Sequence, residues 1–576
     1  MSRSPRWSLL ALFATSAILF AACGGATSPS PSAASPSASG PAPSSGEPFD
    51  GAMYPENGES ACGTEGYSGQ MGLIKATAAN TVEFTLCAPD AAFLSKVAFT
   101  TLGIQDADYL EETGGGGDLI REPVGTGPYK LDHWTDGQEI VLATNEDYWG
   151  DPPKTPGAVI RWSAEAAQRL VELQSGNVDG IDNVGADDFP TVEGDSSLQL
   201  KPRTALNIFY VGFNNTAPPF DKEEVRQAIA MGINRQEIVD TFYPPGSQVA
   251  THFTPCDIPG GCAGEDWYEF DAATAKQMLT DAGFDFTKTY PLSLRDVVRG
   301  YLPEPVTVAT ALQAQLKTNL GINTSIDVRD ENTYLNEASR GELKGIHLLG
   351  WGADYPDVTN FLDVHFGLGS TDQFGTKWDD ITGPLADGAQ TADQAAREGF
   401  YEQANNAIKQ HVPMIPIAHG GSGLAFKADV EGAHSSPLGN EALFAMKAGD
   451  RDQIVWMQNG EPGGLYCPDE TDGESLRVCE QIMEPLYSYS IGGTDPVPQL
   501  ATGCEANEDS TVWTCTLRDG VTFHNGATLD ANDVVATFAV QWDAEHPLHV
   551  GKSESGLFDY WTFLFAGFLN PPPPAA

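Results

Sequence analysis

The segment WGADYPD, residues 351–357, contains the carboxylate that is the best candidate for a chemical role in this chain. It follows an apolar stretch, 346–349, which predicts a buried strand that ends close to Asp354. A carboxylate there can pair with a cationic group, and such a charge-assisted hydrogen bond contributes roughly 1.5–3 kcal/mol. Asp also caps turns often, so a purely structural role is the alternative. Trp351 and Tyr355 could line a cleft or belong to the core.

A second candidate is the segment EPGG, which places Glu461 and Pro462 before Gly463 and Gly464. Glycine has no side chain to hold another backbone away, so these glycines permit close approach of a second chain. An ordinary glycine turn explains the same residues almost equally well.

The motifs of common enzyme classes are missing from the sequence. Residues 420–423 read GGSG, which is not the GxSxG motif of hydrolases. The sequence has neither a P-loop nor a GxGxxG with an acidic partner. His546 and His549 are close together, but Pro547 lies between them and a third ligand is lacking, which argues against a metal site. We therefore expect a protein that is not an enzyme and that uses no cofactor or metal.

Alternating helices and strands are expected to position these candidates. Residues 81–86 alternate apolar and polar types and predict a strand. A helix is predicted from Asp271, a good N-cap, to Gly283, a typical stop. Another helix is predicted over 305–320, and an alternating strand follows at 322–328. Helices that alternate with strands indicate an α/β fold.

The size and charge of the chain narrow its class. Its 576 residues are enough for two or three domains with separate cores. The net charge of -48 argues against nucleic acid and anionic lipid as partners, because both require a positive surface.

The N-terminus has the pattern of an exported lipoprotein. Arg3 and Arg6 precede an apolar run, 7–22, which is short for a membrane span and typical of a signal peptide. Small residues then lead to Cys23, as in a bacterial lipobox, so we expect lipidation of Cys23. An ordinary signal peptide with a chance cysteine is the alternative. Residues 24–49 are rich in Ser, Pro, Ala and Gly and predict a tether.

Eight of the nine cysteines remain after Cys23 is set aside, and an even number in an exported protein indicates disulfides. Eight cysteines allow about 105 connectivities. Closeness in sequence favours three pairs and leaves a fourth: Cys504 with Cys515, Cys256 with Cys262, Cys467 with Cys479, and Cys62 with Cys87.

Several distinct segments match the motifs of one known family: LRDGVTFHNG (517–526), PVGTGPYKLDHW (123–134), FNNTAPPFDKEEVRQAIAMGINRQEIV (213–239), GWGADYPDVTNFL (350–362) and HVPMIPIAH (411–419). They resemble the family 5 solute-binding proteins of ABC importers, the dipeptide/oligopeptide-binding type. The resemblance covers nearly the whole chain after the tether. It implies an α/β, periplasmic-binding-protein-like fold with two lobes, three subdomains, mixed sheets and a hinge.

The order of these motifs differs from the order in the family. The LRDGVTFHNG motif belongs in the first quarter of a family member, and here it comes near the end. Residues 449–474 resemble the family's mature N-terminus, although they follow a segment that resembles its later part. The chain therefore resembles a circular permutant, with a joint at 446–449 and new ends at 565–569 and 49–51. A tandem fragment and an error of sequence assembly are the alternatives.

This permuted order predicts how the chain is divided. After a signal peptide at 1–23 and the tether, we expect a small subdomain of lobe I from 50–118 plus 503–576, the rest of lobe I from 119–215 plus 416–502, and lobe II from 216–415. Residues 517–535 should pack beside the strand at 81–86.

The resemblance also implies a function. In peptide-binding family members the first Asp of the GWxADY motif holds the α-ammonium group of the ligand, and that role falls on Asp354. The strand that matches 461–463 runs along the ligand and pairs with its main chain. The ligand-binding residues implied in this way are Trp351, Gly352, Asp354, Tyr355, Glu461, Pro462 and Gly463.

We therefore expect a monomeric lipoprotein on the outer face of the cytoplasmic membrane. Its expected partners are a peptide ligand, the permease subunits of an ABC importer, and the membrane through the lipid anchor only. The same fold also hosts other solutes, so a nickel complex, haem or an oligosaccharide is an alternative ligand. A ligand sensor without transport and a hydrolase on this scaffold are alternatives from other classes.

Overall fold

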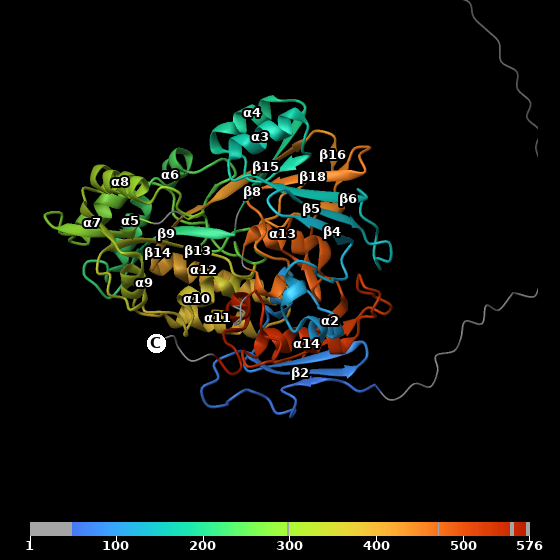
Figure 1. The fold of residues 1–576 in the computed structure, drawn as a ribbon. Helices are drawn as coiled ribbons and strands as arrows, with labels where there is room; N and C mark the ends of the chain where they lie inside the picture. The colour runs from blue at the N-terminus through green and yellow to red at the C-terminus, as the bar shows by residue number, and fades with distance from the viewer. Residues whose placement is uncertain (1–48, 205, 297–298, 471, 553–557, 572–576) are drawn as a thin grey trace, which may run out of the picture. The chain divides into compact units, whose positions relative to one another are not determined.

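The computed structural model describes residues 49–204, 206–296, 299–470, 472–552 and 558–571 (Figure 1). The expected signal peptide, the lipidation of Cys23 and the tether up to residue 48 lie outside the described residues. In the described ranges, no helix combines the length and the apolar character needed to cross a membrane.

A five-stranded antiparallel sheet joins the two ends of the described chain. Its order is β1 (Met53–Tyr54), β2 (Met71–Ala78), β3 (Thr81–Leu86), β22 (Val512–Leu517) and β21 (Ala501–Ala506). The centre of the sheet is the pairing of β3 with β22, in which Phe84 lies opposite Trp513. Helix α14 (Ala531–Trp542, red in Figure 1) packs on β2 (blue) and also contacts β3. The expected contact between 517–535 and the strand at 81–86 is present.

A seven-stranded mixed sheet contains the segment after the expected joint. Its order is β4 (Tyr129–Thr135), β5 (Glu139–Thr144), β6 (Gly157–Trp162), β18 (Gln453–Gln458), β7 (Gly180–Ile181), β15 (Gly421–Lys427) and β8 (Leu198–Thr204). Strand β18 is central and runs parallel to both neighbours, β6 and β7. Its residues are therefore enclosed on both sides, and Ile454 and Trp456 are fully buried.

A six-stranded mixed sheet carries the WGADYPD segment. Its order is β10 (Gln248–Val249), β14 (Met414–His419), β9 (Asn207–Phe213), β13 (Ile346–Gly352), β11 (Thr289–Arg295) and β12 (Asn323–Arg329). Two further pairs are short: β16 (Val430–Glu431) with β17 (Lys447–Ala448), and β19 (Tyr487–Tyr489) with β20 (Pro496–Pro498).

The α-helices of the described ranges alternate with these strands along much of the chain. They are α1 (Phe93–Lys96), α2 (Ala107–Thr113), α3 (Ala166–Ser175), α4 (Phe189–Gly194), α5 (Glu223–Gly232), α6 (Arg235–Phe242), α7 (Ala272–Asp281), α8 (Pro305–Gln315), α9 (Glu331–Ser339), α10 (Leu362–Phe366), α11 (Asp379–Gln390), α12 (Gln394–His411), α13 (Gly473–Ile482), α14 and α15 (Asp559–Phe565).

The local signals read from the sequence explain where two of these helices begin and end. Asp271 caps α7 by accepting hydrogen bonds from the backbone N–H groups of Ala273 and Thr274. Helix α8 begins at Pro305, which has no N–H to leave unsatisfied, and continues as one π-helical turn up to Gly321. That glycine has a φ of 81°, the left-handed conformation that ends a helix. Both helices and the strand after the second one are confirmed.

The LRDGVTFHNG segment is held by the PVGTGPY bend from the other end of the chain. His524 Nδ1 accepts a hydrogen bond from the Gly125 backbone N–H at 3.2 Å, and His524 Nε2 lies 3.1 Å from the Gly127 carbonyl. Burial lowers the pKa of His524 to about 4, so the ring is neutral near pH 7. His524 therefore has a structural role in joining two motifs.

Four buried charges connect segments on both sides of the expected joint. Arg203 on β8 and Arg477 on α13 each pair with both Asp182, just after β7, and Glu441. Burial opposes ionisation of the two carboxyls, yet the guanidinium groups hold the pKa of Asp182 and of Glu441 below the ordinary value. The cluster is therefore a closed set of two positive and two negative charges.

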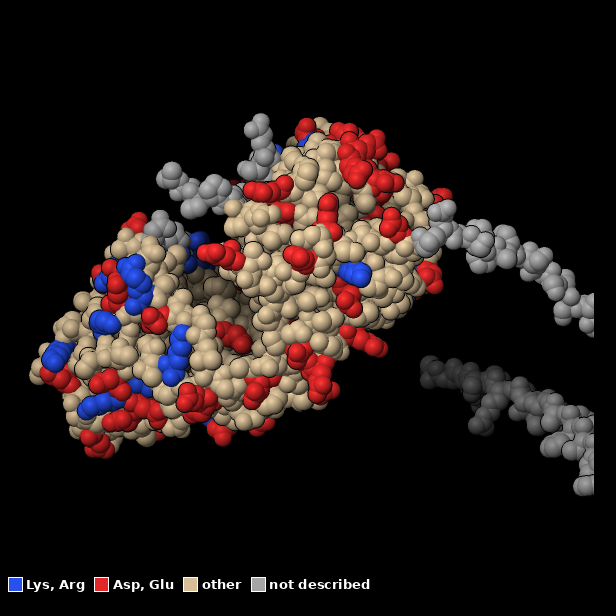
Figure 2. Space-filling view, turned by 90° about the horizontal axis from the view of Figure 1, so that it is seen from below, with Lys and Arg blue, Asp and Glu red and all other residues tan. Residues whose placement is uncertain are grey.

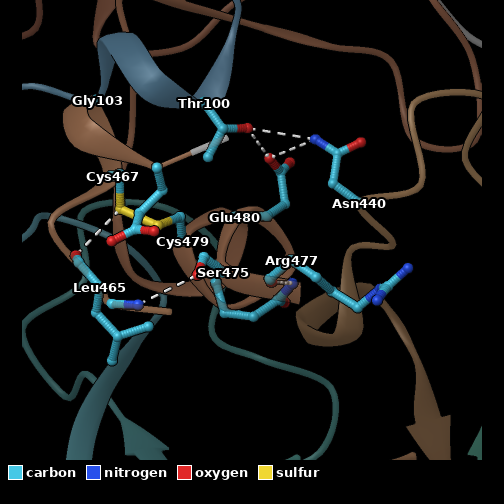
Figure 3. Close-up of a disulfide and its surroundings, with 12 residues drawn as sticks. Thr100, Gly103, Asn440, Leu465, Cys467, Ser475, Arg477, Cys479 and Glu480 are labelled. Atoms are coloured by element: carbon cyan, nitrogen blue, oxygen red, sulfur yellow. Dashed lines mark hydrogen bonds between the residues drawn. A yellow bond between two sulfur atoms is a disulfide. The ribbon is translucent and has the colours of Figure 1, made fainter. Parts of the chain in front are cut away.

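The described residues form four disulfides, which are the pairs favoured by the sequence: Cys62–Cys87, Cys256–Cys262, Cys467–Cys479 and Cys504–Cys515. Figure 3 shows Cys467 and Cys479, which link the turn after Leu465 to α13. The Cys504–Cys515 bridge crosses directly between β21 and β22.

We predict that the Cys62–Cys87 bridge stabilises the protein more than the Cys256–Cys262 bridge does. The first spans 25 residues and the second spans 6, so the first removes more conformational entropy from the unfolded chain. Paired Cys→Ala substitutions should lower the free energy of unfolding by about 3 kcal/mol and about 2 kcal/mol respectively. Urea unfolding of the two double variants measures the difference, and the reverse order would contradict the prediction.

Candidate functional site

Asp354 lies just beyond the end of β13, and Asn360 holds it there. The Asp354 backbone N–H donates to Asn360 Oδ1 at 2.9 Å, and Asn360 Nδ2 donates to Asp354 Oδ2 at 3.0 Å. The Trp351 indole N–H also donates to Asn360 Oδ1, at 3.2 Å. Asn360 is only 2% exposed, so this amide fixes the loop from the inside. A lone Asn has no distinctive sequence pattern, so the role of Asn360 was not predicted.

The Asp354 carboxylate has no cationic partner among the described residues. It is half-buried, and this burial raises its pKa above the ordinary value. The hydrogen bond from Asn360 offsets only part of that rise. None of the ion pairs between described residues includes Asp354. A partly desolvated carboxylate without a counter-ion gains more from a cationic ligand than a fully hydrated one does.

The strand end beside Asp354 is open to solvent. Gly352 is exposed, and a Cβ atom added there would have no neighbour within 4 Å. Trp351 is half-buried and stacks edge-on against His365, with 5.0 Å between ring centroids. Backbone groups of Gly352 and the edge of Trp351 can therefore meet a ligand.

Tyr355 lies in the core and not at this open end. It is 7% exposed and packs in the apolar cluster that surrounds the five-stranded sheet. Its hydroxyl lies 3.1 Å from Thr359 Oγ1, and Lys96 Nζ lies 4.9 Å from the centre of its ring. Lys96 in turn pairs with Asp90 at 2.6 Å. In this structure Tyr355 connects the WGADYPD segment to residues 90–96 by packing.

The second candidate segment is anchored through its side chains. Glu461 Oε1 accepts hydrogen bonds from the Trp134 indole N–H and the Gly137 backbone N–H, both at 3.0 Å, at the turn between β4 and β5. Pro462 is buried and Gly463 is exposed. The Gly463 N–H donates to Ser475 Oγ at 2.9 Å, so the first turn of α13 holds the loop.

Gly464 lies close to the buried side chain of Glu470. A Cβ atom at this position would lie 2.2 Å from Glu470 Oε1, so any other residue here would require the Glu470 carboxylate to shift. The close approach predicted for these glycines is therefore used inside the protein at Gly464, and Gly463 remains as the position open to a ligand.

Tyr560 on α15 lies close to both candidate segments. Burial, together with the charges of Asp354 and Asp472, raises the pKa of Tyr560 to about 12. Asp472 caps α13 by accepting from the Ser475 N–H at 2.7 Å, and its Oδ2 lies 3.3 Å from the Cβ position of Gly463. A phenol from the C-terminal region thus stands within electrostatic reach of both segments. No sequence signal pointed to Tyr560.

The face in Figure 2 has the acidic character expected from the composition. Asp and Glu side chains are spread over it, and a hollow opens on it. Lys and Arg side chains are fewer and gather mainly on one side of this view. Such a surface favours solutes with positive groups over anionic ones.

Comparison with known proteins identifies the family. The model of the bacterial extracellular solute-binding proteins, family 5, matches residues 34–373 and 495–555. The chain belongs to this family. A di/tripeptide-binding protein of Pseudomonas aeruginosa is 30% identical over 380 residues, which are 64% of this chain and 70% of that protein. A heme-binding protein A of Haemophilus influenzae is 27% identical, over 64% of this chain and 68% of that protein.

Solved structures agree on the fold. The structure of HbpA2 from Haemophilus parasuis superposes with a TM-score of 0.61 at 26% identity, over 66% of this chain and 75% of that chain. The periplasmic murein tripeptide-binding protein MppA, in its unliganded open form, gives 0.51 at 17% identity, which speaks for the fold alone. This chain therefore has the expected α/β, two-lobed binding-protein fold with mixed sheets.

A buried acid next to the site should make stability depend on pH. Asp363 lies near the ion pair of Asp357 with Arg397, and burial, with the charge of Asp357, raises its pKa to about 8. The folded protein thus holds this proton up to about pH 8, whereas an unfolded Asp loses it near pH 4. The protonated Asp363 therefore contributes its full stability below pH 4. This contribution falls as the pH rises from 4 and is lost above about pH 8.

Asp363→Asn should therefore raise the free energy of unfolding at pH 8 by roughly 1–3 kcal/mol and reduce its fall between pH 4 and 8. Urea unfolding at several pH values measures this effect. Asp240→Asn, at an exposed position on α6, is the matched control and should leave the pH profile unchanged. A parallel profile for Asp363→Asn and the wild type would refute the prediction.

Proposed function

We propose that this protein captures peptides with a free N-terminus and delivers them to an ABC importer. The observation that carries the proposal is the partly desolvated Asp354 carboxylate, which has no cationic partner among the described residues and stands at an open strand end. Membership of a solute-binding family and the di/tripeptide-binding relative support it.

In the proposed complex the peptide α-ammonium group pairs with Asp354. The main chain of Gly352 and the carbonyl of the exposed Gly463, whose N–H is bonded to Ser475, offer backbone groups to the ligand, and Trp351 offers an apolar edge. Main-chain pairing of this kind gives affinity with little dependence on the ligand's side chains. The ligand stabilises the closed form because it contacts both lobes only when they are closed.

The family relatives also include a heme-binding protein, which makes haem the second ligand to test. Haem carries carboxylate groups, and an unpaired Asp354 would repel them. The charge of the site therefore favours a peptide. We further propose that the protein acts as a monomer. In this proposal it is lipidated at Cys23 and held on the outer face of the cytoplasmic membrane.

We also propose that the chain is a circular permutant of this family. The family model matches two separate stretches of the chain, which is compatible with a permuted order. At the expected joint, only four residues lie between β17, which ends at Ala448, and the central strand β18. The described ends both meet α14: Asn532 Oδ1 accepts from the Ala52 N–H, and the Leu569 N–H donates to the Trp542 carbonyl. Asn532 and Trp542 are ten positions apart on α14, so these contacts are about 15 Å apart.

Asp354→Asn tests the proposed ligand contact. The variant keeps an oxygen for Asn360 but loses the charge, so peptide affinity should fall about 10- to 100-fold while the melting temperature stays near wild type. Isothermal titration calorimetry with an alanine tripeptide measures the change. N-terminal acetylation of the same peptide removes the ammonium and should weaken binding to the wild type equally. Normal binding by the variant would show that Asp354 is not the contact.

Reordering the chain tests the permutation. A variant that starts at 449, runs to 571, and continues through an eight-residue Gly/Ser linker into 49–448 restores the family order, and such a linker can span about 15 Å. It should form the same four disulfides, melt within about 5 °C of the natural order, and bind the tripeptide. Failure to fold where the natural order folds would count against the permutation.

A further inference from the structure

A cavity of about 760 Å³ lies beside the C-terminal end of α13, apart from the proposed peptide site. None of its lining residues belongs to the segments 351–355 or 461–464. Its walls come from the loop at 148–154, the segment 434–445 that leads to the expected joint, and residues 480–499. Its volume is in the range of small-molecule binding sites.

Aromatic and aliphatic side chains form much of the wall. Trp149 and Phe444 are half-buried and line the cavity together with Met483 and Val497. Ile491, also in the lining, is 58% exposed, so a large apolar side chain faces solvent at this site. Such walls favour a ligand with an apolar body. Arg518 already lies over the Trp149 ring, 4.3 Å from its centre, so this ring offers a ligand apolar contact.

Two ionisable groups in the cavity wall already have hydrogen-bond partners within the protein. Glu484 accepts hydrogen bonds from four side chains: Thr126, Tyr148, Trp149 and Gln499. His434 Nε2 accepts from the Ala442 N–H at 3.2 Å, and burial lowers its pKa, so the ring is neutral. Neither group requires a ligand.

Glu480 is different because only one of its oxygens is used. Figure 3 shows Glu480 Oε2 accepting from Thr100 Oγ1 at 2.6 Å and from Asn440 Nδ2 at 3.0 Å. Among the hydrogen bonds and ion pairs of the described residues, none reaches Oε1 and none joins Glu480 to a Lys or Arg. The wall therefore presents a carboxyl oxygen without a partner beside aromatic rings.

The charges around Glu480 favour a cation as its partner. Glu484 acts on it electrostatically, and Asp151 adds another carboxylate at the exposed edge of the cavity. Glu441 also acts on it, but its charge is balanced by Arg203 and Arg477. Lys154 is the basic side chain in the lining, and it is exposed. Tyr489 also lies near, with its hydroxyl donating to the Ser95 carbonyl at 2.7 Å. An anionic ligand would face repulsion from these carboxylates.

We infer that this cavity is a second binding site, for an organic cation that carries a protonated amine on an apolar ring-containing body. The amine pairs with Glu480 Oε1, and the apolar body lies against Trp149 and Phe444. This site is independent of peptide capture at Asp354.

Calorimetry with three ligands of one shape tests the inference: tryptamine, which is cationic, tryptophol, which is neutral, and indole-3-acetate, which is anionic. Tryptamine should bind at least about 10-fold more tightly than tryptophol, and indole-3-acetate should not bind. Burial raises the pKa of Glu480 to about 7, so tryptamine affinity should rise between pH 6 and 8 as the carboxyl ionises while the amine stays charged. Equal affinities for the cation and the neutral compound would overturn the inference.

Variants locate the site. Glu480→Gln keeps an acceptor for Thr100 and Asn440 but has no charge, so tryptamine affinity should fall to the level of tryptophol. Ile491→Lys, at the exposed edge, should weaken tryptamine binding at least about 10-fold through repulsion, whereas the matched variant Ile491→Gln should change it less. If Glu480→Gln does not fold, the comparison of Ile491→Lys with Ile491→Gln tests the inference instead.

Asp354→Asn separates this site from the peptide site. It should leave tryptamine binding unchanged, and Glu480→Gln should leave peptide binding unchanged. If tryptamine binding survives in Glu480→Gln and is lost in Asp354→Asn, the amine occupies the peptide site and the inference is wrong. A failure of peptide binding alone would not affect these results.

Discussion

The buried charge cluster of Asp182, Arg203, Glu441 and Arg477 is the constraint on which the rest of the structure depends. Each charge has been removed from water, which is costly, and only its partners inside the protein offset that cost. Loss of one member would leave an unpaired buried charge and would cost about 3–5 kcal/mol. Because two members precede the expected joint by more than two hundred residues and one follows it, the cluster can form only when all these segments are in their final places.

The cluster also sets the position of α13, and α13 organises two separate sites. At its start, Asp472 and Ser475 hold the loop that contains Gly463. At its end, Glu480 faces the cavity with Thr100 and Asn440. Arg477 lies between these ends and fixes the helix by its charge. The covalent link from Cys467 to Cys479 acts on the same helix (Figure 3). One rigid element therefore connects the proposed peptide site, the cavity and the segment that leads to the expected joint.

Patterns of local spacing predicted much of the fold. The caps at Asp271 and Gly321 predicted helix ends because they depend on hydrogen bonds within a few residues. The cysteine spacing favoured the observed pairs because short loops keep partners close. The candidate site was predicted less completely. The role of Asp354, taken from its motif, stays a prediction, and Tyr355, for which cleft and core were both possible, lies in the core. The side chain of Glu461 proved to be bound to a hairpin more than three hundred positions earlier.

By itself the sequence determined the family resemblance, the α/β class, the acidic surface and the carboxylate at the end of a buried strand. All of these follow from composition or from residues close together in the chain. Only the tertiary structure decided that Asn360 holds Asp354, that Tyr560 lies near both candidate segments, and that one oxygen of Glu480 has no protein partner. These facts depend on which side chains meet across long separations. Packing decides such contacts, and no local pattern encodes them.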